Sequence, residues 1–240
     1  MIAEPSTEPR RPLVAARARP WIVVLMVLAL AAFVAMAGSL HDSGDPTGFD
    51  SAVASWLYRH FGLIVQQILL ALTEPGLTIG ALVVVLAGAA LARRWDIAVL
   101  TAVAPVIALG LMRYVLKPAI NRSFGDVVKL SHGQILPGPA FPSGHETALT
   151  SVTVLLALLA LRSSWTRRTK SISVATAVAW TIAGAAGLVR SAYHYATDTV
   201  GGILLALVVT LGTALLVDVL GPRFVSSPDV RSPSRTPPAA

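Results

Sequence analysis

Long apolar runs recur along the chain, and each is long enough to cross a bilayer. The first, WIVVLMVLALAAFVAMAGS at residues 21–39, holds no charged side chain. About 20 apolar residues in a helix span the roughly 30 Å of hydrocarbon in a membrane. Such runs lie at about residues 21–39, 66–92, 96–116, 146–161, 172–189 and 199–220. The sequence therefore predicts an all-α, polytopic integral membrane protein with six transmembrane helices in one bundle.

Composition agrees with a membrane protein. Only 13% of the residues are charged and 55% are hydrophobic, whereas about a quarter of a soluble domain is charged. The net charge of +7 is spread over the two terminal segments and the short segments between the apolar runs, so we do not expect nucleic acid as a partner. The absence of cysteine excludes disulfides, thiolate metal sites and a cysteine nucleophile.

The first apolar run could be a cleaved signal peptide or a retained helix. The arginines that precede it suit both interpretations. A signal core has about 7–15 apolar residues, which is shorter than this run, and MAGSLHDSG is only a passable cleavage site. We expect a retained helix.

The segments between the runs carry few structural signals. Pro75, within the second run, is expected to kink or start a helix. FDSAVASWLYRHFG, residues 49–62, could form a helix that is capped by Asp50 and lies on the membrane surface. GDVVKLSHGQILPGPA, residues 125–140, is typical of a loop.

Basic residues predict the orientation, because they are enriched in cytoplasmic segments. With a cytoplasmic N-terminus, the 19 basic residues divide thirteen inside to six outside. Both termini are therefore expected in the cytoplasm. The terminal segments are rich in Pro, Ser and Arg, so we predict a disordered basic tail at 1–20, a six-helix domain at 21–220 and a disordered tail at 221–240.

Polar residues from three distant segments fall at the outer ends of these helices. The third helix ends in MRYVLKPAINRSFGD, the fourth begins after PGPAFPSGHETALTS, and the sixth begins after VRSAYHYATDTVGG. The predicted topology puts all three at one membrane face. Charged groups beside a membrane span are costly unless they are paired or functional. We therefore predict a site for an anion there.

The residue types suit a phosphate ester. Lysine and arginine side chains, together with the serine and free backbone N–H groups before a helix, can neutralise phosphoryl oxygens. The candidate phosphate ligands are Lys117, Arg122, Ser143, Gly144 and Arg190. His194 and His145 can attack phosphorus or exchange protons near neutral pH. Asp198 lies one helical turn after His194 and can orient its ring.

These motifs resemble those of the type 2 phosphatidic acid phosphatase superfamily, which shares its site with vanadium haloperoxidases. PSGH matches the second family motif, RSAYHYATD resembles the third, and KPAINRSF matches the first in part. The resemblance covers about residues 50–220 and implies six helices and metal-independent catalysis without a cofactor. It also implies that His194 is the nucleophile, which forms a phosphohistidine, and that His145 is the general acid and base.

The chain departs from the family pattern at two places. The third motif has three residues between Arg190 and His194, where the family usually has five. The arginine of the first motif would fall on Phe124, seven residues after the lysine. Arg122 is assigned to phosphate by its chemistry, and Arg113 is a possible substitute.

Other histidines and acids have simpler interpretations. His41, His60 and His132 are expected to be solvated loop residues, and Glu146 is expected to be a favourable carboxylate in the first turn of a helix. One rival function is a zinc hydrolase with His145, His194 and Asp198 as ligands. The neighbouring cations would repel a metal ion. The other rival is a transporter or binding protein for a phosphorylated lipid, without catalysis.

A site at the membrane surface suits a lipid that enters from the bilayer. Phosphatidic acid, phosphatidylglycerol phosphate and polyprenyl (pyro)phosphate all remain possible substrates, since no residue distinguishes them. Helices rich in alanine and valine suggest a prokaryotic inner membrane, with the site on the extracytoplasmic side. The sequence does not indicate an oligomeric state.

Overall fold

The computed structural model describes residues 12–124 and 139–225, and all regular structure in these ranges is helical. Six segments are long and apolar enough to span a membrane: Ala16–Leu40, Leu63–Leu91, Trp95–Ile120, Gly144–Arg162, Arg167–Arg190 and Ala196–Gly221. The predicted all-α membrane protein with six spanning helices is confirmed.

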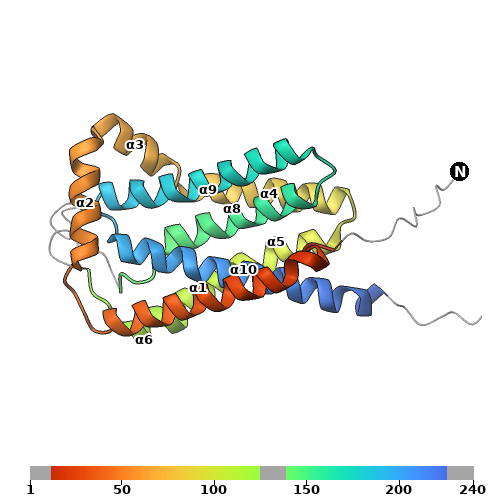
Figure 1. Cartoon of the computed structure of the whole chain (residues 1–240), viewed down its shortest axis with the longest axis horizontal. Helices are drawn as coiled ribbons and strands as arrows, with labels where there is room; N and C mark the ends of the chain where they lie inside the picture. The colour runs from red at the N-terminus through yellow and green to blue at the C-terminus, as the bar shows by residue number, and fades with distance from the viewer. Residues whose placement is uncertain (1–11, 125–138, 226–240) are drawn as a thin grey trace, which may run out of the picture.

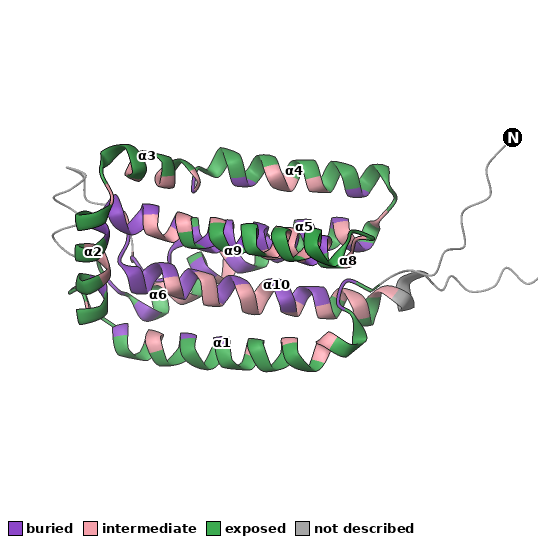
Figure 2. Cartoon of the chain, turned by 45° about the horizontal axis from the view of Figure 1, so that its top comes forward, coloured by how far each residue is buried: buried purple, intermediate pink, exposed green. Residues whose placement is uncertain are grey.

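The spanning helices run alongside one another down the long axis of the molecule (Figure 1). They are α1 (Arg19–Leu40), α3 (Leu63–Ala71) with α4 (Pro75–Leu91), α5 (Trp95–Leu111), α8 (Gly144–Arg162), α9 (Arg167–Arg190) and α10 (Ala196–Val225). Helix α8 is central, because 56% of its most apolar stretch is buried, against 11% for α1. Exposed residues cover most of α1 and α4 in Figure 2, and they are largely apolar, as a lipid-facing surface should be.

Two prolines set where helices begin. Pro75 is the first residue of α4, which confirms that this proline starts a helix. Pro118 has no N–H to donate to the carbonyl of Tyr114, four residues earlier. At this point α5 is followed by a π-helical turn, η2 (Met112–Leu116), and then by the short helix α6 (Lys117–Ile120). Lys117 is the first residue of α6, directly after this break.

Helix α2 (Gly48–His60) crosses one end of the bundle (Figure 1). Its cap differs from the prediction. Thr47 is the N-cap, and Asp50 is the third helical residue: Thr47 Oγ1 accepts from the Asp50 N–H, and the Asp50 carboxylate accepts from the Thr47 N–H. This reciprocal pair is a capping box. Leu57 of α2 packs on Val189 and Ala196, which fixes α2 over the junction of α9 and α10.

Residues 12–20, which lie in the tail predicted to be disordered, make specific contacts in the structure. The backbone N–H groups of Leu13 and Val14 donate to the Asp218 carboxylate at 2.7 and 2.8 Å, and both side chains are buried. A short 3-10 turn, η1 (Ala16–Ala18), leads into α1. This contact also places the start of α1 beside the end of α10, which continues to Val225.

Three predicted segments lie wholly or mostly outside the described residues. They are residues 1–11 of the N-terminal tail, residues 226–240 of the C-terminal tail, and residues 125–138 of the predicted loop.

Candidate active site

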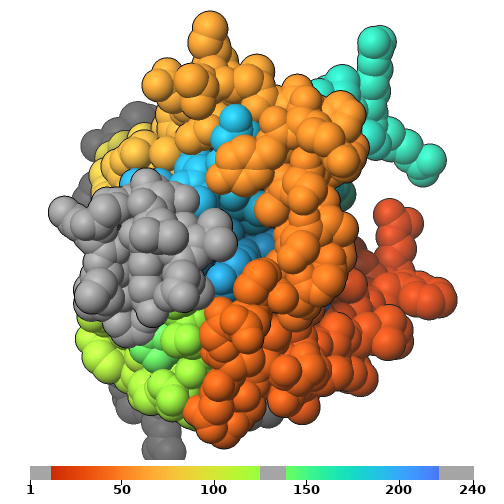
Figure 3. Space-filling view, turned by 90° about the vertical axis from the view of Figure 1, so that its left-hand side faces the viewer, coloured from red at the N-terminus to blue at the C-terminus, as the bar shows by residue number. Residues whose placement is uncertain are grey.

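The three motif segments meet at the end of the bundle that α2 crosses. The Ser143 N–H donates to the Asp198 carbonyl at 2.9 Å, which joins the start of α8 to the start of α10. Phe124, Ala140 and Tyr195 form a small buried cluster that adds the segment after α6. In the space-filling view onto this end, the blue segment near the α9–α10 junction is visible in a hollow beside α2 (Figure 3). The convergence of the three segments at one end is therefore present in the structure.

Helix α8 begins at the PSGH motif. Ser143 is the N-cap, and its hydroxyl accepts from the Glu146 N–H at 3.4 Å. The first N–H groups of a helix have no partner inside the helix, so those of Gly144 and His145 are suited to bind an anion. The side chain of Ser143 is buried, whereas His145 is exposed. His145 lines a small cavity of about 90 Å³ together with Leu70, Thr73, Glu74, Pro75, Leu188 and Tyr193.

The turn between α9 and α10 positions His194. Helix α9 ends with two capping hydrogen bonds, from Tyr193 N–H to the Leu188 carbonyl and from Ala192 N–H to the Val189 carbonyl. This is a Schellman motif, and its left-handed position is held by Ala192 at φ 54°. Alanine is strained there, which costs about 1 kcal/mol. The sharp reversal brings His194 onto the end of the bundle.

His194 is buried between Phe124 and Asp198. Its ring centroid lies 5.5 Å from that of Phe124, and its Nδ1 lies 3.4 Å from Asp198 Oδ2. A carboxylate oxygen can only accept, so this contact favours a proton on Nδ1 and leaves the Nε2 lone pair free. Asp198 Oδ2 also accepts from the Tyr195 N–H at 3.0 Å.

Lys117 lies close to the same groups. Its ammonium donates to the Pro139 carbonyl and lies 6.0 Å from the centroid of the Phe124 ring. It is also within electrostatic range of Asp198 and of Arg113, which is exposed on η2. His145 in turn is within electrostatic range of His194 and Lys117. Lys117 and both histidines therefore share one neighbourhood.

Arg190 contacts the segment between α2 and α3. Its Nε donates to the Phe61 carbonyl at 2.9 Å and its Nη1 donates to Gln66 at 2.7 Å. Its guanidinium also stacks on Tyr58, 4.2 Å from the ring centroid. This arginine thus ties α9 to α2 and α3, in addition to any contact with substrate.

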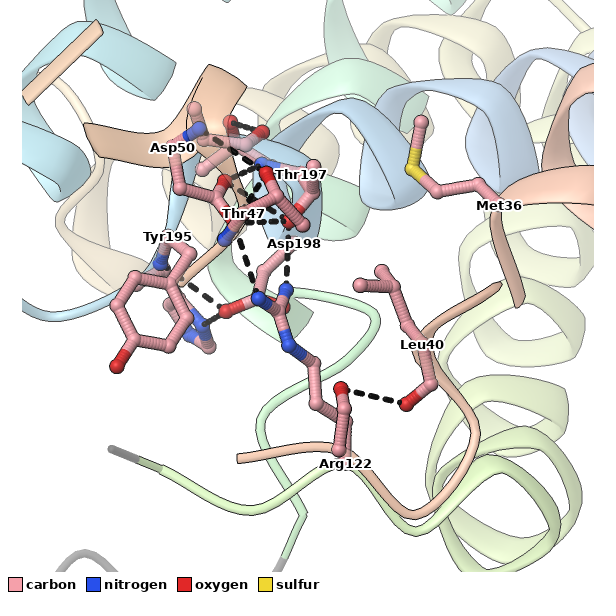
Figure 4. Close-up of polar contacts among 12 residues, drawn as sticks. Met36, Leu40, Thr47, Asp50, Arg122, Tyr195, Thr197 and Asp198 are labelled. Atoms are coloured by element: carbon pink, nitrogen blue, oxygen red, sulfur yellow. Dashed lines mark hydrogen bonds and ion pairs between the residues drawn. The ribbon is translucent and has the colours of Figure 1, made fainter. Parts of the chain in front are cut away.

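Arg122 contacts two carboxylates. Its side chain is fully buried, with Nη1 2.6 Å from Asp198 Oδ1 and Nη2 3.0 Å from Asp50 Oδ2. Figure 4 shows the guanidinium pointing toward the cluster that Asp50, Thr197 and Asp198 form. The sequence placed Arg122 on the substrate phosphate; the structure places it in this cluster.

Asp50 lies in the same cluster, although the sequence did not predict it among the candidate site residues. It was interpreted only as a helix cap, yet its carboxylate also accepts from the N–H and the hydroxyl of Thr197. Burial by itself would raise the pKa of Asp50. The hydrogen bonds from Thr197, Thr47 and Arg122 outweigh that effect and hold the pKa of this carboxyl below its usual value. Asp50 is therefore charged at neutral pH. In the sequence, the only feature that indicates Asp50 is its place as an acidic residue in the predicted helix of residues 49–62.

Glu146 is in the first turn of α8, as expected, but it is fully buried. Its Oε1 accepts from Thr150, and its Oε2 has no hydrogen-bond partner within the described residues. His41 and His60 are exposed; His60 ends α2 and stacks on Trp56. His132 lies outside the described residues. In the described ranges no three His, Asp or Glu side chains are grouped closely enough to hold a metal ion.

Comparison with known proteins identifies the family. The sequence model of the PAP2 superfamily matches residues 98–221, just over half of the chain. The chain belongs to the PAP2 superfamily. Among solved structures it resembles the crystal structure of a transmembrane PAP2-type phosphatidylglycerolphosphate phosphatase from Bacillus subtilis. That match has a TM-score of 0.61 and 21% identity, and it covers 82% of this chain and 96% of the other. No curated protein matches the sequence.

Membership of the PAP2 superfamily makes the departure at Phe124 informative. Phe124 occupies the position where the family pattern has an arginine, and its ring lies between Lys117 and His194. An aromatic ring at this point adds no charge to the site. This PAP2 protein therefore has no cation at position 124. Arg122, two residues earlier, contacts the carboxylates of Asp50 and Asp198.

Proposed function

We propose that this chain is a membrane phosphatase that hydrolyses a lipid phosphate monoester or pyrophosphate through a phosphohistidine. The observation that carries the proposal is the pairing of His194 with Asp198 next to the N-terminus of α8. A buried imidazole with an acceptor on Nδ1 presents Nε2 as a nucleophile. The adjacent helix N-terminus suits the phosphoryl oxygens.

The proposed reaction has two displacements at phosphorus. In the first, the lone pair of His194 Nε2 forms an N–P bond while the P–O bond to the lipid breaks, and His145 gives a proton to the departing oxygen. In the second, His145 takes a proton from water, which attacks phosphorus. The N–P bond then breaks, its electron pair returns to Nε2, and inorganic phosphate leaves. Both steps use only side chains of this chain, so we propose that no metal ion is required.

The phosphoryl oxygens need positive charge and donors. We propose that Lys117, the Ser143 hydroxyl, and the N–H groups at Gly144 supply them. Arg190 contributes through Nη2 and the second N–H of Nη1, because its Nε and one N–H of Nη1 donate to Phe61 and Gln66. Asp198 stabilises the positive charge that develops on His194.

The lipid character of the substrate is supported by an apolar cavity beside the site. The cavity holds about 340 Å³ between α4, α8 and α9, and it is lined by Gly76, Leu77, Gly80, Ala81, Val84, Val85, Leu156 and Trp180. Pro75, the residue before Gly76, lines the small cavity that contains His145. The two cavities therefore reach neighbouring residues at the start of α4. We propose that the phosphate binds at the histidines while a hydrocarbon chain lies along α4.

The sidedness of the site is also a proposal. The start of α1 and the end of α10 lie together, at the end of the bundle opposite α2 (Figure 1). With thirteen of the basic residues on the inner segments, both termini would be cytoplasmic and the site extracytoplasmic. In a bacterium this would be the inner membrane.

The function is tested by measuring inorganic phosphate released by purified protein in detergent. The panel holds phosphatidic acid, phosphatidylglycerol phosphate and a polyprenyl pyrophosphate, each with and without EDTA. A lipid phosphatase of this kind releases phosphate from at least one lipid at the same rate with EDTA. Release that EDTA abolishes would favour a metal hydrolase, and no release from any lipid would favour a transporter or binding protein.

Filling the apolar cavity is expected to weaken binding of long-chain substrates. Gly80→Leu places a side chain where a hydrocarbon chain would lie. Loss of burial of about two methylene groups raises KM for a long-chain lipid about tenfold. KM for a water-soluble aryl phosphate should not change. Gly88→Leu is the matched control, because it adds the same side chain to an exposed position of α4 outside the cavity. Equal effects of the two variants, or an equal effect on both substrates, would contradict this placement of the chain.

A further inference from the structure

The terminal hydrogen-bond donors of Arg122 are occupied by the protein, whereas its buried Nε has no hydrogen-bond partner within the described residues. Nη1 donates to Asp198 Oδ1 and to Thr197 Oγ1, each at 2.6 Å. Nη2 donates to Asp50 Oδ2 at 3.0 Å and to the Asp45 carbonyl at 3.4 Å. Each terminal nitrogen carries two N–H groups, so all four have acceptors. The Tyr195 ring stacks on the guanidinium at 4.7 Å. Arg122 therefore has no terminal N–H left for a phosphate.

The Asp50 carboxylate, which accepts from Arg122, is also held by other hydrogen bonds. Asp50 Oδ1 accepts from the N–H of Thr197 at 2.8 Å, and Asp50 Oδ2 accepts from the N–H of Thr47 at 2.9 Å. Asp50 is 1% exposed and belongs to α2, the helix over the site. It thus connects α2 to Thr197, which precedes Asp198, and to the guanidinium that holds Asp198. Figure 4 shows these side chains converging from three separate segments.

The Asp198 carboxylate is held at both oxygens. Arg122 holds Oδ1, and the Tyr195 N–H holds Oδ2 at 3.0 Å, so the group cannot rotate freely about its terminal bond. In this orientation Oδ2 faces His194 Nδ1. Without Arg122, Oδ1 would lose its only described partner and the carboxylate could turn away. The geometry of the nucleophile thus depends on a residue that does not touch it.

The negative charge of Asp50 offsets the positive charge of Arg122 beside Asp198. Arg122 alone would cancel the charge of Asp198 and leave little to stabilise positive charge on the His194 ring. Asp50 offsets the guanidinium, so the three groups together carry one negative charge. Because they are buried, that charge is poorly screened. An uncharged residue at position 50 would make the trio neutral.

We propose that Asp50 and Arg122 are positioning residues, which orient Asp198 and keep it effectively negative, and that Arg122 does not bind the substrate phosphate. The proposal rests on the proposed role of His194 as nucleophile. It also assigns a function to α2, because this helix carries Asp50. It also means that Arg122, two residues before the position of the family arginine, does not supply positive charge to the substrate.

Asp50→Asn tests the proposal with little change in shape. We expect kcat on the best lipid substrate to fall about 10–100-fold, as it does when a hydrogen-bond partner behind a metal-ligating residue is removed. KM and the inhibition constant of inorganic phosphate should stay within about twofold. Lys117→Ala is the contrasting variant, because loss of a phosphate ligand should raise that inhibition constant. Asp45→Asn is the matched control: its carboxylate is exposed, and the carbonyl that contacts Arg122 is retained. It should behave as wild type.

A spectroscopic readout follows the tautomer directly. In 15N-histidine-labelled protein, assigned by comparison with His194→Ala, His194 should be protonated on Nδ1. Asp50→Asn should give a mixture of Nδ1 and Nε2 protonation, and Asp45→Asn should not. This measurement needs no turnover. It therefore remains decisive if the wild-type protein releases no phosphate, an outcome that would refute the proposed function alone.

A paired substitution separates positioning from folding. Arg122→Gln alone leaves two buried carboxylates without a cation and is expected to lower Tm strongly. Asp50→Leu with Arg122→Met removes the cation and one of the two carboxylates, so Tm should recover in part, while kcat stays low because Asp198 Oδ1 still lacks its partner. Recovery of kcat together with Tm would show that the pair is only structural and would overturn the proposal. A rise in the phosphate inhibition constant in Arg122→Gln, parallel to that in Lys117→Ala, would overturn it as well.

Discussion

His194→Ala is expected to abolish phosphate release from every substrate, by at least about 10⁴-fold in kcat. The proposed nucleophile is needed whatever the leaving group, and removal of a nucleophile from a coupled catalytic set commonly removes nearly all of its rate enhancement. The expectation follows from the position of the ring, which is buried against Phe124 and contacts Asp198 through Nδ1. Release of inorganic phosphate from a lipid and from an aryl phosphate measures it.

The control for this variant is His41→Ala. His41 is exposed and contacts only the neighbouring Asp42 within the described residues. It should retain full turnover and wild-type Tm. If His194→Ala kept more than a few per cent of wild-type turnover with either substrate, His194 could not be the nucleophile.

Asp198→Asn is expected to lower kcat by about 10³–10⁴-fold with little change in KM. In Ser-His-Asp enzymes the same change to the orienting aspartate costs about 10⁴ in kcat, because the histidine adopts the wrong tautomer. Here an asparagine amide could turn its N–H₂ toward His194 Nδ1 and thereby favour a proton on Nε2, which removes the lone pair that attacks phosphorus. The variant also removes the charge that Arg122 Nη1 contacts.

Asp218→Asn is the matched control for Asp198→Asn. Asp218 lies on the same helix, α10, and its side chain is also buried, but it binds the N–H groups of Leu13 and Val14 at the opposite end of the bundle. Its substitution should lower Tm and leave kcat near wild type. Equal losses of kcat in the two variants would mean that Asp198 contributes stability and not catalysis.

The spanning helices could be predicted because their signal is local. An apolar run of bilayer length, or a proline such as Pro75, acts through its own segment, and neither depends on which residues lie nearby in space. Alternation of the helices then brings Lys117, Ser143 and His194 to one end of the bundle without any knowledge of packing. Family motifs added the expected roles of these residues.

The partners of Arg122 and Asp50 could not be predicted in this way. A guanidinium binds a carboxylate as well as it binds a phosphate, so chemistry alone left the choice open. The partner of Arg122 is set by the position of α2. This helix places Asp50 Oδ2 3.0 Å from Arg122 Nη2, although the two residues are 72 positions apart. Asp50 already had a sufficient local explanation as a capping residue. Its second role becomes visible only in three dimensions.

The contacts of residues 12–20 could not be predicted for a similar reason. Residues 12–20 are rich in arginine, alanine and proline and show no apolar period of their own. Their order comes from Asp218, more than 200 positions away, whose carboxylate accepts from two consecutive N–H groups. A buried carboxylate must find donors, and the backbone of residues 13 and 14 supplies them.

Trapping the phosphoenzyme tests the central claim most directly. In His145→Ala protein mixed with an activated aryl phosphate, the leaving group departs without a general acid, whereas hydrolysis of the intermediate lacks a base. We expect a burst of aryl alcohol near one equivalent, and acid-labile, base-stable phosphate located on His194 by mass spectrometry. Phosphate found on another residue, or a His145→Ala protein that turns over without any phosphoenzyme, would contradict the account.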